Sequence, residues 1–66
     1  MEGWKYWEGK KVFVILKNKR QYQGKVILIN IDKNEILVFI TIIDKFGDRV
    51  VFCNSEIEIM KEEEER

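Results

Sequence analysis

The chain has 66 residues, with 12 basic and 12 acidic side chains, one cysteine and no histidine. One cysteine excludes an internal disulfide, the lack of histidine argues against a four-ligand zinc site, and no apolar run approaches the roughly 20 residues that cross a bilayer. With no secretory signal at the start, we expect one small cytoplasmic domain over residues 1–66, with no membrane association.

Two tryptophans lie three positions apart within residues 1–9. A helix of one or two turns would place Trp4 and Trp7 on one face, and Gly9 is a suitable residue to end it. No good capping residue precedes this segment, so packing would have to hold it. We expect a short N-terminal helix whose tryptophans cover the core. The alternative is that these rings, with lysines nearby, stack on bases.

Two apolar segments, Val12 to Leu16 and Tyr22 to Ile31, flank a charged break of hairpin-loop length. Their β-branched residues favour strands over helices. Within the break, Asn18 is the residue expected to adopt the left-handed conformation. Gly24 interrupts the second segment, and a glycine inside a strand usually marks a bend, a bulge or a close backbone approach.

The third predicted strand, Glu35 to Ile43, is apolar on both faces. Such a strand must be covered on both sides, and a chain of this size has little with which to cover it. Either the sheet bends enough to wrap its own second face, or a partner subunit covers part of it.

The remainder predicts a loop from Asp44 to Asp48, with Gly47 at a positive φ, and a short fourth strand over Val50 to Phe52. A fifth strand contains Ile57 and Ile59, and an acidic tail follows over residues 61–66. We expect the core to include five branched residues from these strands: Ile27, Val38, Ile40, Val50 and Ile57.

The segment from Lys11 to Val26 resembles the first motif of the Sm and Sm-like (Lsm) proteins. That motif is a hydrophobic strand, Leu-Lys-Asn-Gly-Arg, an aromatic residue, and Gly-x-Leu or Gly-x-Val; this chain has Leu-Lys-Asn-Lys-Arg, then Tyr22 and Gly24. The resemblance is to archaeal-type small Sm-like proteins. It implies an all-β fold with a small helical part, namely a five-stranded, strongly bent antiparallel barrel behind a short N-terminal helix.

The same resemblance implies rings of six or seven subunits, in which the fourth strand of one subunit pairs with the fifth strand of the next. It also implies an RNA pocket built from two loops. Asn34 matches the pocket asparagine, whose amide offers a base edge one donor and one acceptor. Asp32 occupies the stacking position and Cys53 the arginine position, while Asn54 replaces the glycine of the second motif and is expected in a left-handed conformation. We expect a homo-oligomeric ring that binds single-stranded RNA through Asn34 and Lys33.

Catalysis has little support, because there is no histidine base and Cys53 has no evident partner to activate it. We therefore expect no enzyme, no catalytic residues, no cofactor and no metal. Two alternatives remain open: an Sm-fold oligomerisation scaffold that does not bind RNA, and an unrelated small barrel that binds a protein. The abundance of Lys and Glu is one mark of hyperthermophiles, although an AT-rich genome gives a similar bias.

Overall fold

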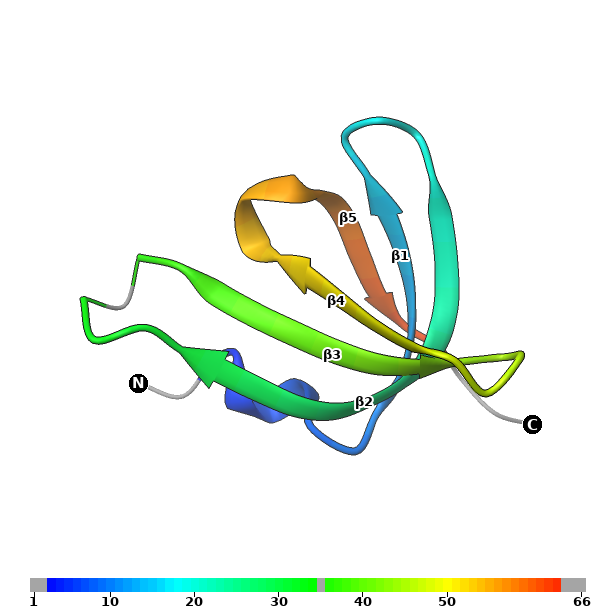
Figure 1. Cartoon of the computed structure of the whole chain (residues 1–66), viewed down its shortest axis with the longest axis horizontal. Helices are drawn as coiled ribbons and strands as arrows, with labels where there is room; N and C mark the ends of the chain where they lie inside the picture. Colours follow the sequence, from blue (N-terminus) through cyan, green and yellow to red (C-terminus); the bar gives the residue numbers. More distant parts are fainter. Residues whose placement is uncertain (1–2, 35, 64–66) are drawn as a thin grey trace.

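The computed structural model describes residues 3–34 and 36–63. Five strands and two single turns of 3-10 helix follow one another along the chain, as Figure 1 shows. In order they are η1 (Lys5–Trp7), β1 (Lys11–Leu16), β2 (Gln21–Ile31), β3 (Val38–Asp44), β4 (Arg49–Cys53), η2 (Asn54–Glu56) and β5 (Ile57–Glu62).

All five strands belong to one sheet in the order β4-β3-β2-β1-β5, and neighbouring strands are antiparallel. The central strand, β2, pairs with β1 through its first residues and with β3 through its later ones. Figure 1 shows β2 curving from one hairpin into the other. The predicted set of five antiparallel strands is therefore confirmed, with β4 and β5 at the two edges of the sheet.

The change of partner along β2 occurs at Gly24. This residue is opposite Val12 of β1 and also opposite Asp44 of β3. A side chain at Gly24 would overlap the carbonyl group of Ile43. The glycine thus permits the close backbone approach that its position in the strand predicts.

The core consists of nine buried side chains from β1 to β4: Val12, Val14, Leu16, Val26, Ile29, Val38, Ile40, Ile42 and Phe52. The predictions of Val38 and Ile40 are confirmed, while Val50 and Ile57 are partly buried against this cluster. The prediction of Ile27 is wrong, because this residue is 42% exposed. Ile27 follows the buried Val26 and faces the other side of the strand, and the register shift between Val26 and Leu28 returns Ile29, in place of Leu28, to the core.

The N-terminal segment forms one 3-10 turn in place of the expected one or two turns of helix. It has no side-chain cap, and none of its three residues is buried. Trp4 and Trp7 nevertheless pack against the core, as predicted. Gly9 follows at φ 84°, which redirects the chain into β1. In the described part of the chain no helix is long and apolar enough to cross a membrane.

The turn between β1 and β2 corrects one residue of the prediction. Lys19, not Asn18, is left-handed, at φ 76°. The Asn18 carboxamide oxygen instead accepts the backbone N–H of Arg20 at 3.0 Å. Asn18 thereby opens the turn as an Asx residue, and the left-handed position falls on its neighbour. In the β3–β4 turn Gly47 takes φ 86°, as predicted.

Candidate nucleic-acid interface

The loop between β2 and β3 carries the residues expected to bind RNA. The backbone N–H of Asp32 donates to the carbonyl of Leu37 at 2.9 Å, so the chain has already turned before Val38 begins β3. This explains why the third strand starts later than Glu35, a position outside the described residues. The carboxylate of Asp32 accepts the backbone N–H of Asn34 at 2.9 Å. Asp32 therefore shapes the loop, rather than offering a surface on which a base could stack.

Lys33 and Asn34 are both exposed at the tip of this loop. Within residues 3–34 and 36–63, neither side chain has a hydrogen-bond or ionic partner. The Asn34 carboxamide is thus available to a ligand through both its donor and its acceptor. Lys33 places a cation beside it.

Asn54, which directly follows β4, is hydrogen-bonded to the β2–β3 loop. Its carboxamide nitrogen donates to the carbonyl of Ile36 at 3.1 Å, and its oxygen accepts the backbone N–H of Val38 at 3.2 Å. Asn54 is the first residue of η2 and is not left-handed, contrary to the prediction. A carboxamide that serves a donor and an acceptor on another segment has no local signature in the sequence, and this role was not predicted.

Cys53 lies at the end of β4, opposite Phe39 of β3. Its half-buried sulfur accepts a hydrogen bond from the Ser55 hydroxyl at 3.3 Å and approaches the Asn54 carboxamide oxygen at 3.4 Å. Among the described residues Cys53 makes no hydrogen bond to Asn34. The structure therefore joins the β2–β3 loop to the segment after β4 through Asn54. Asn34 and Cys53, the two positions that the resemblance selects, do not make this connection.

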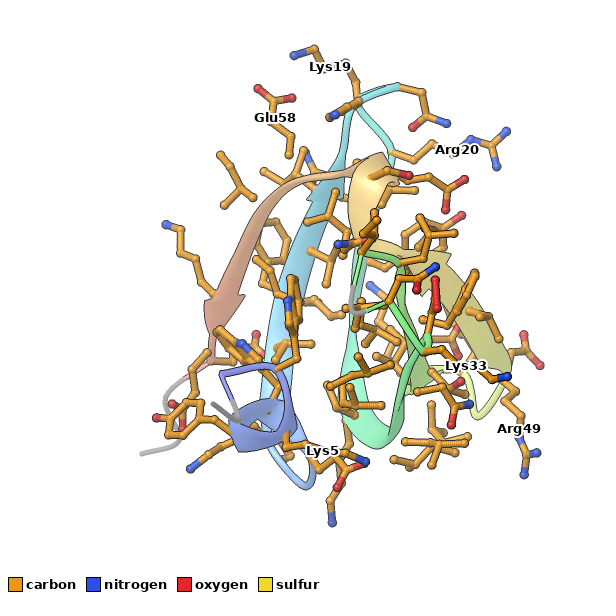
Figure 2. All side chains as sticks on the ribbon, turned by 90° about the vertical axis from the view of Figure 1, so that its left-hand side faces the viewer. Lys5, Lys19, Arg20, Lys33, Arg49 and Glu58 are labelled. Carbon is orange, nitrogen blue, oxygen red and sulfur yellow. The ribbon has the colours of Figure 1, made fainter. Side chains whose placement is uncertain are left out.

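Basic side chains project from several separate segments of the chain (Figure 2). Lys19 is paired with Glu58 at 3.2 Å, whereas Arg20, Lys33 and Arg49 have no carboxylate within 4.0 Å in the described part of the chain. These three side chains come from different ends of the sheet. Arg20 precedes and Lys33 follows the 11-residue strand β2, and Arg49 pairs with Ile43 at the end of β3 that is farthest from the β2–β3 loop. Lys33 is therefore the cation that stands beside Asn34, where it can attract a phosphate.

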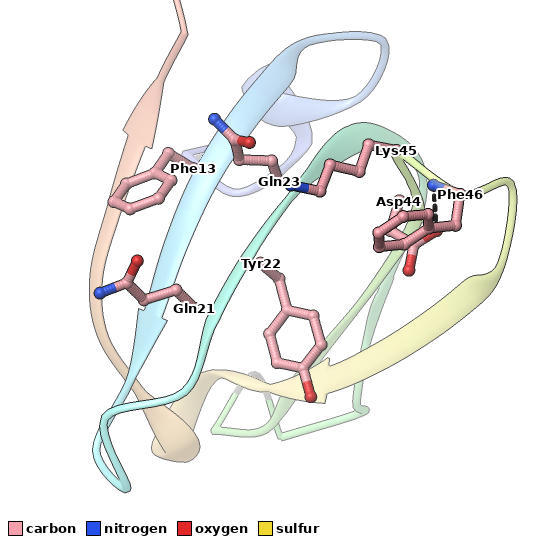
Figure 3. A pocket seen from close by; sticks show the side chains of 7 residues that line it. All are labelled: Phe13, Gln21, Tyr22, Gln23, Asp44, Lys45 and Phe46. Carbon is pink, nitrogen blue, oxygen red and sulfur yellow. Dashed lines mark hydrogen bonds between the residues drawn. The ribbon is translucent and has the colours of Figure 1, made fainter.

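A pocket of about 240 Å³ lies away from this loop, between β1, β2 and the β3–β4 turn (Figure 3). Its lining combines aromatic rings with amide and charged groups: Phe13, Gln21, Tyr22, Gln23, Asp44, Lys45 and Phe46. The ring of Phe46 is 78% exposed, and the Lys45 ammonium group lies 5.4 Å from its centre. The carboxylate of Asp44 accepts the backbone N–H groups of Phe46 and Asp48 at 2.9 and 2.8 Å, so it is occupied by the turn.

The described residues contain no group of three or more His, Cys, Asp or Glu side chains that could hold a metal ion. Comparison with protein-family models, with curated proteins and with solved structures finds no match to this chain.

Proposed function

We propose that this chain is an Sm-like protein that assembles into a homo-oligomeric ring and presents its β2–β3 loops to single-stranded RNA. In this proposal the five strands form a strongly bent barrel, and the N-terminal turn takes the place of the family's short helix. The strand order β4-β3-β2-β1-β5 supports it, because the fourth and fifth strands are then free to pair with neighbouring subunits.

The observation that carries the proposal is the pair of open sheet edges. β4 pairs only with β3 and β5 pairs only with β1 among the described residues. Each edge strand also exposes an aliphatic side chain, since Val51 is 57% and Ile59 41% exposed. An open edge with apolar residues favours pairing with another chain. Pairing β4 with β5 of the next subunit would satisfy both sets of backbone groups, and repetition of this heterologous contact closes a ring.

RNA binding rests on the exposed loop residues. The Asn34 carboxamide can hydrogen-bond to a base edge, and Lys33 can contact a phosphate. One such site is weak, because neither an aromatic ring nor an arginine stands at the positions that the family pocket uses. A ring strengthens binding by offering several sites to one strand at high effective concentration.

Native mass spectrometry combined with a salt titration tests both parts. We expect the subunits to form a closed oligomer that binds oligo-U, with an affinity that falls steeply as salt rises. Asn34→Ala should weaken binding by roughly 1 to 3 kcal/mol per occupied site and leave the oligomer mass unchanged. An oligomer that binds neither oligo-U nor oligo-A at low salt would establish the scaffold alternative. A monomer at micromolar concentration would refute the ring.

The pocket of Figure 3 supports a second candidate function, the binding of an extended peptide. Residues Gln21–Gln23 pair with β1, whereas pairing with β3 begins only at Gly24. Among the described residues, the edge of Gln21–Gln23 that points away from β1 therefore has no neighbouring strand, and it borders the pocket. An extended peptide could add to this edge and place an apolar side chain among the rings of Tyr22 and Phe46. Isothermal titration with a Leu-rich acidic peptide tests this. If the wild type binds the peptide and Phe46→Ala does not, this candidate function is favoured. If the wild type gives no heat of binding, the peptide is excluded as a ligand.

A further inference from the structure

The later half of β2 has a strand on only one side. Its pairing with β1 ends at Lys25, whereas its pairing with β3 continues to Ile31. On the side of β1, both backbone groups of Val26 still have hydrogen-bond partners. The N–H of Val26 donates to the carbonyl of Lys10 at 2.9 Å, and the carbonyl of Val26 accepts the N–H of Gly9 at 2.8 Å. From Ile27 onward, none of the strands in the described residues lies opposite on that side. An unpaired edge of this kind is open to other chains.

Two side chains of the N-terminal segment occupy this edge at Ile29. The Glu8 carboxylate accepts the backbone N–H of Ile29 at 2.9 Å, and the Lys5 ammonium group donates to the carbonyl of the same residue at 3.0 Å. Lys5 and Glu8 also pair with one another at 3.4 Å. Together they supply one donor and one acceptor, as an adjacent strand would. Figure 1 shows η1 lying beside this part of β2.

We infer that the N-terminal turn is a strap that closes the β1-side edge of β2, with Lys5 and Glu8 in the position of a missing strand. The strap keeps this third edge from pairing with other chains and leaves β4 and β5 as the edges through which subunits can associate. Its charged groups make stronger hydrogen bonds than neutral groups would.

The construction of the strap allows it to open without unfolding the sheet. Its turn has only three residues, none of them buried, and the side chains of Lys5 and Glu8 are 47% and 36% exposed. Trp4 and Trp7 pack the strap against the core. The Tyr6 hydroxyl also donates a hydrogen bond to Glu62 of β5 at 3.0 Å. Opening it would expose the Ile29 amide while β1, β2 and β3 remain paired.

Hydrogen exchange of the Ile29 amide, followed by NMR at one protein concentration, tests the strap. Glu8→Ala removes the acceptor, and we expect Ile29 to exchange at least about 10-fold faster than in the wild type, because a hydrogen bond to a charged group is lost. The amides of β3 should keep their wild-type rates. Glu8→Gln retains an acceptor oxygen and should keep most of the protection.

Glu58→Ala is the matched control, because it removes an exposed carboxylate that pairs with Lys19 at 3.2 Å and has no hydrogen bond to the strap. It should leave the Ile29 exchange rate within about twofold of the wild-type rate. If Glu8→Ala does not fold, Lys5→Met tests the other bond, and wild-type protection of Ile29 in that variant would overturn the inference. An unchanged Ile29 exchange rate in Glu8→Ala, or an equal loss of protection in Glu58→Ala, would also overturn the inference. None of these readouts depends on ring formation or on RNA.

Discussion

At the scale of single residues, two backbone positions limit what side chains the fold accepts. Gly24 lies against the carbonyl of Ile43, and Lys19 holds a left-handed conformation that a glycine would adopt without strain. One position therefore excludes any side chain, while the other carries a side chain at some energetic cost. Opposite substitutions at the two positions should have opposite effects on stability.

Gly24→Ala should destabilise the protein by roughly 1 to 3 kcal/mol or more, because the added methyl group must displace the backbone of β3. The free energy of unfolding from urea denaturation measures this. Gly3→Ala is the control, since a methyl group at Gly3 would have no atom within 4 Å. Equal stability of the two variants would show that β2 and β3 can separate freely at this point.

Lys19→Gly should stabilise the turn, by at most about 1 kcal/mol, because it relieves the left-handed backbone of a residue with a side chain. The gain is reduced by the loss of the exposed ion pair with Glu58. A thermal melt at fixed concentration measures it. Lys33→Gly, at an exposed turn residue with no positive φ, should destabilise slightly; a lower melting temperature for Lys19→Gly than for Lys33→Gly would contradict this explanation.

At the scale of secondary-structure elements, Asn54 fastens the end of β4 to the loop that precedes β3. Asn54→Ala removes both of its hydrogen bonds and leaves the N–H of Val38 without its partner. We expect a loss of roughly 1 to 3 kcal/mol in the free energy of unfolding. Ser55→Ala, at an exposed neighbour, should change it by less than about 0.5 kcal/mol. A similar small effect for Asn54→Ala would mean that the loop is held by other contacts.

The edge strands allow a test of assembly that leaves the core intact. Val51→Lys places a charge on the exposed face of β4, and if the proposed ring forms through this strand, the variant should be monomeric by light scattering. Phe46→Lys is the matched control, because Phe46 is an exposed apolar residue in the turn between β3 and β4 and does not belong to the edge strand. If both variants keep the wild-type mass, subunits do not associate through β4.

The strands could be predicted because their signals are local. Runs of β-branched residues placed β1 to β5 nearly where they occur, and Gly24 indicated the close approach of backbones. Ile27 could not be placed, since it stands in a run of apolar residues from Val26 to Ile29, and which of them face the core depends on the register shift between β2 and β3. The contacts of Lys5 and Glu8 with Ile29 join segments distant in the sequence, and such contacts leave no periodic pattern. At the candidate site, Asn34 and Lys33 lie exposed together as predicted, whereas the two hydrogen bonds by which Asn54 holds this loop join segments distant in the sequence.

At the scale of the whole molecule, stability should depend on protein concentration. A chain of this size buries a modest fraction of its surface alone, so contacts between subunits would add to its stability. We expect the melting temperature of the wild type to rise with total protein concentration, as mass action requires. Differential scanning calorimetry over a hundredfold range of concentration, with Val51→Lys as the monomeric control, measures this. A melting temperature independent of concentration in both would indicate that folding is complete in the monomer.

The strand β1 has one neighbour that follows it directly and another from the far end of the chain. Val12 lies opposite Gly24 in β2 and opposite Glu62 in β5. The hairpins β1–β2, β2–β3 and β3–β4 need only short loops to close, whereas the β1–β5 ladder must bring distant segments together, which makes it the entropically expensive step of folding. During synthesis, β1 therefore cannot complete its pairing until β5 has been made. Until residues Ile57–Glu62 have been made, one side of β1 is bare, and the nascent chain is most susceptible to misassembly in that interval.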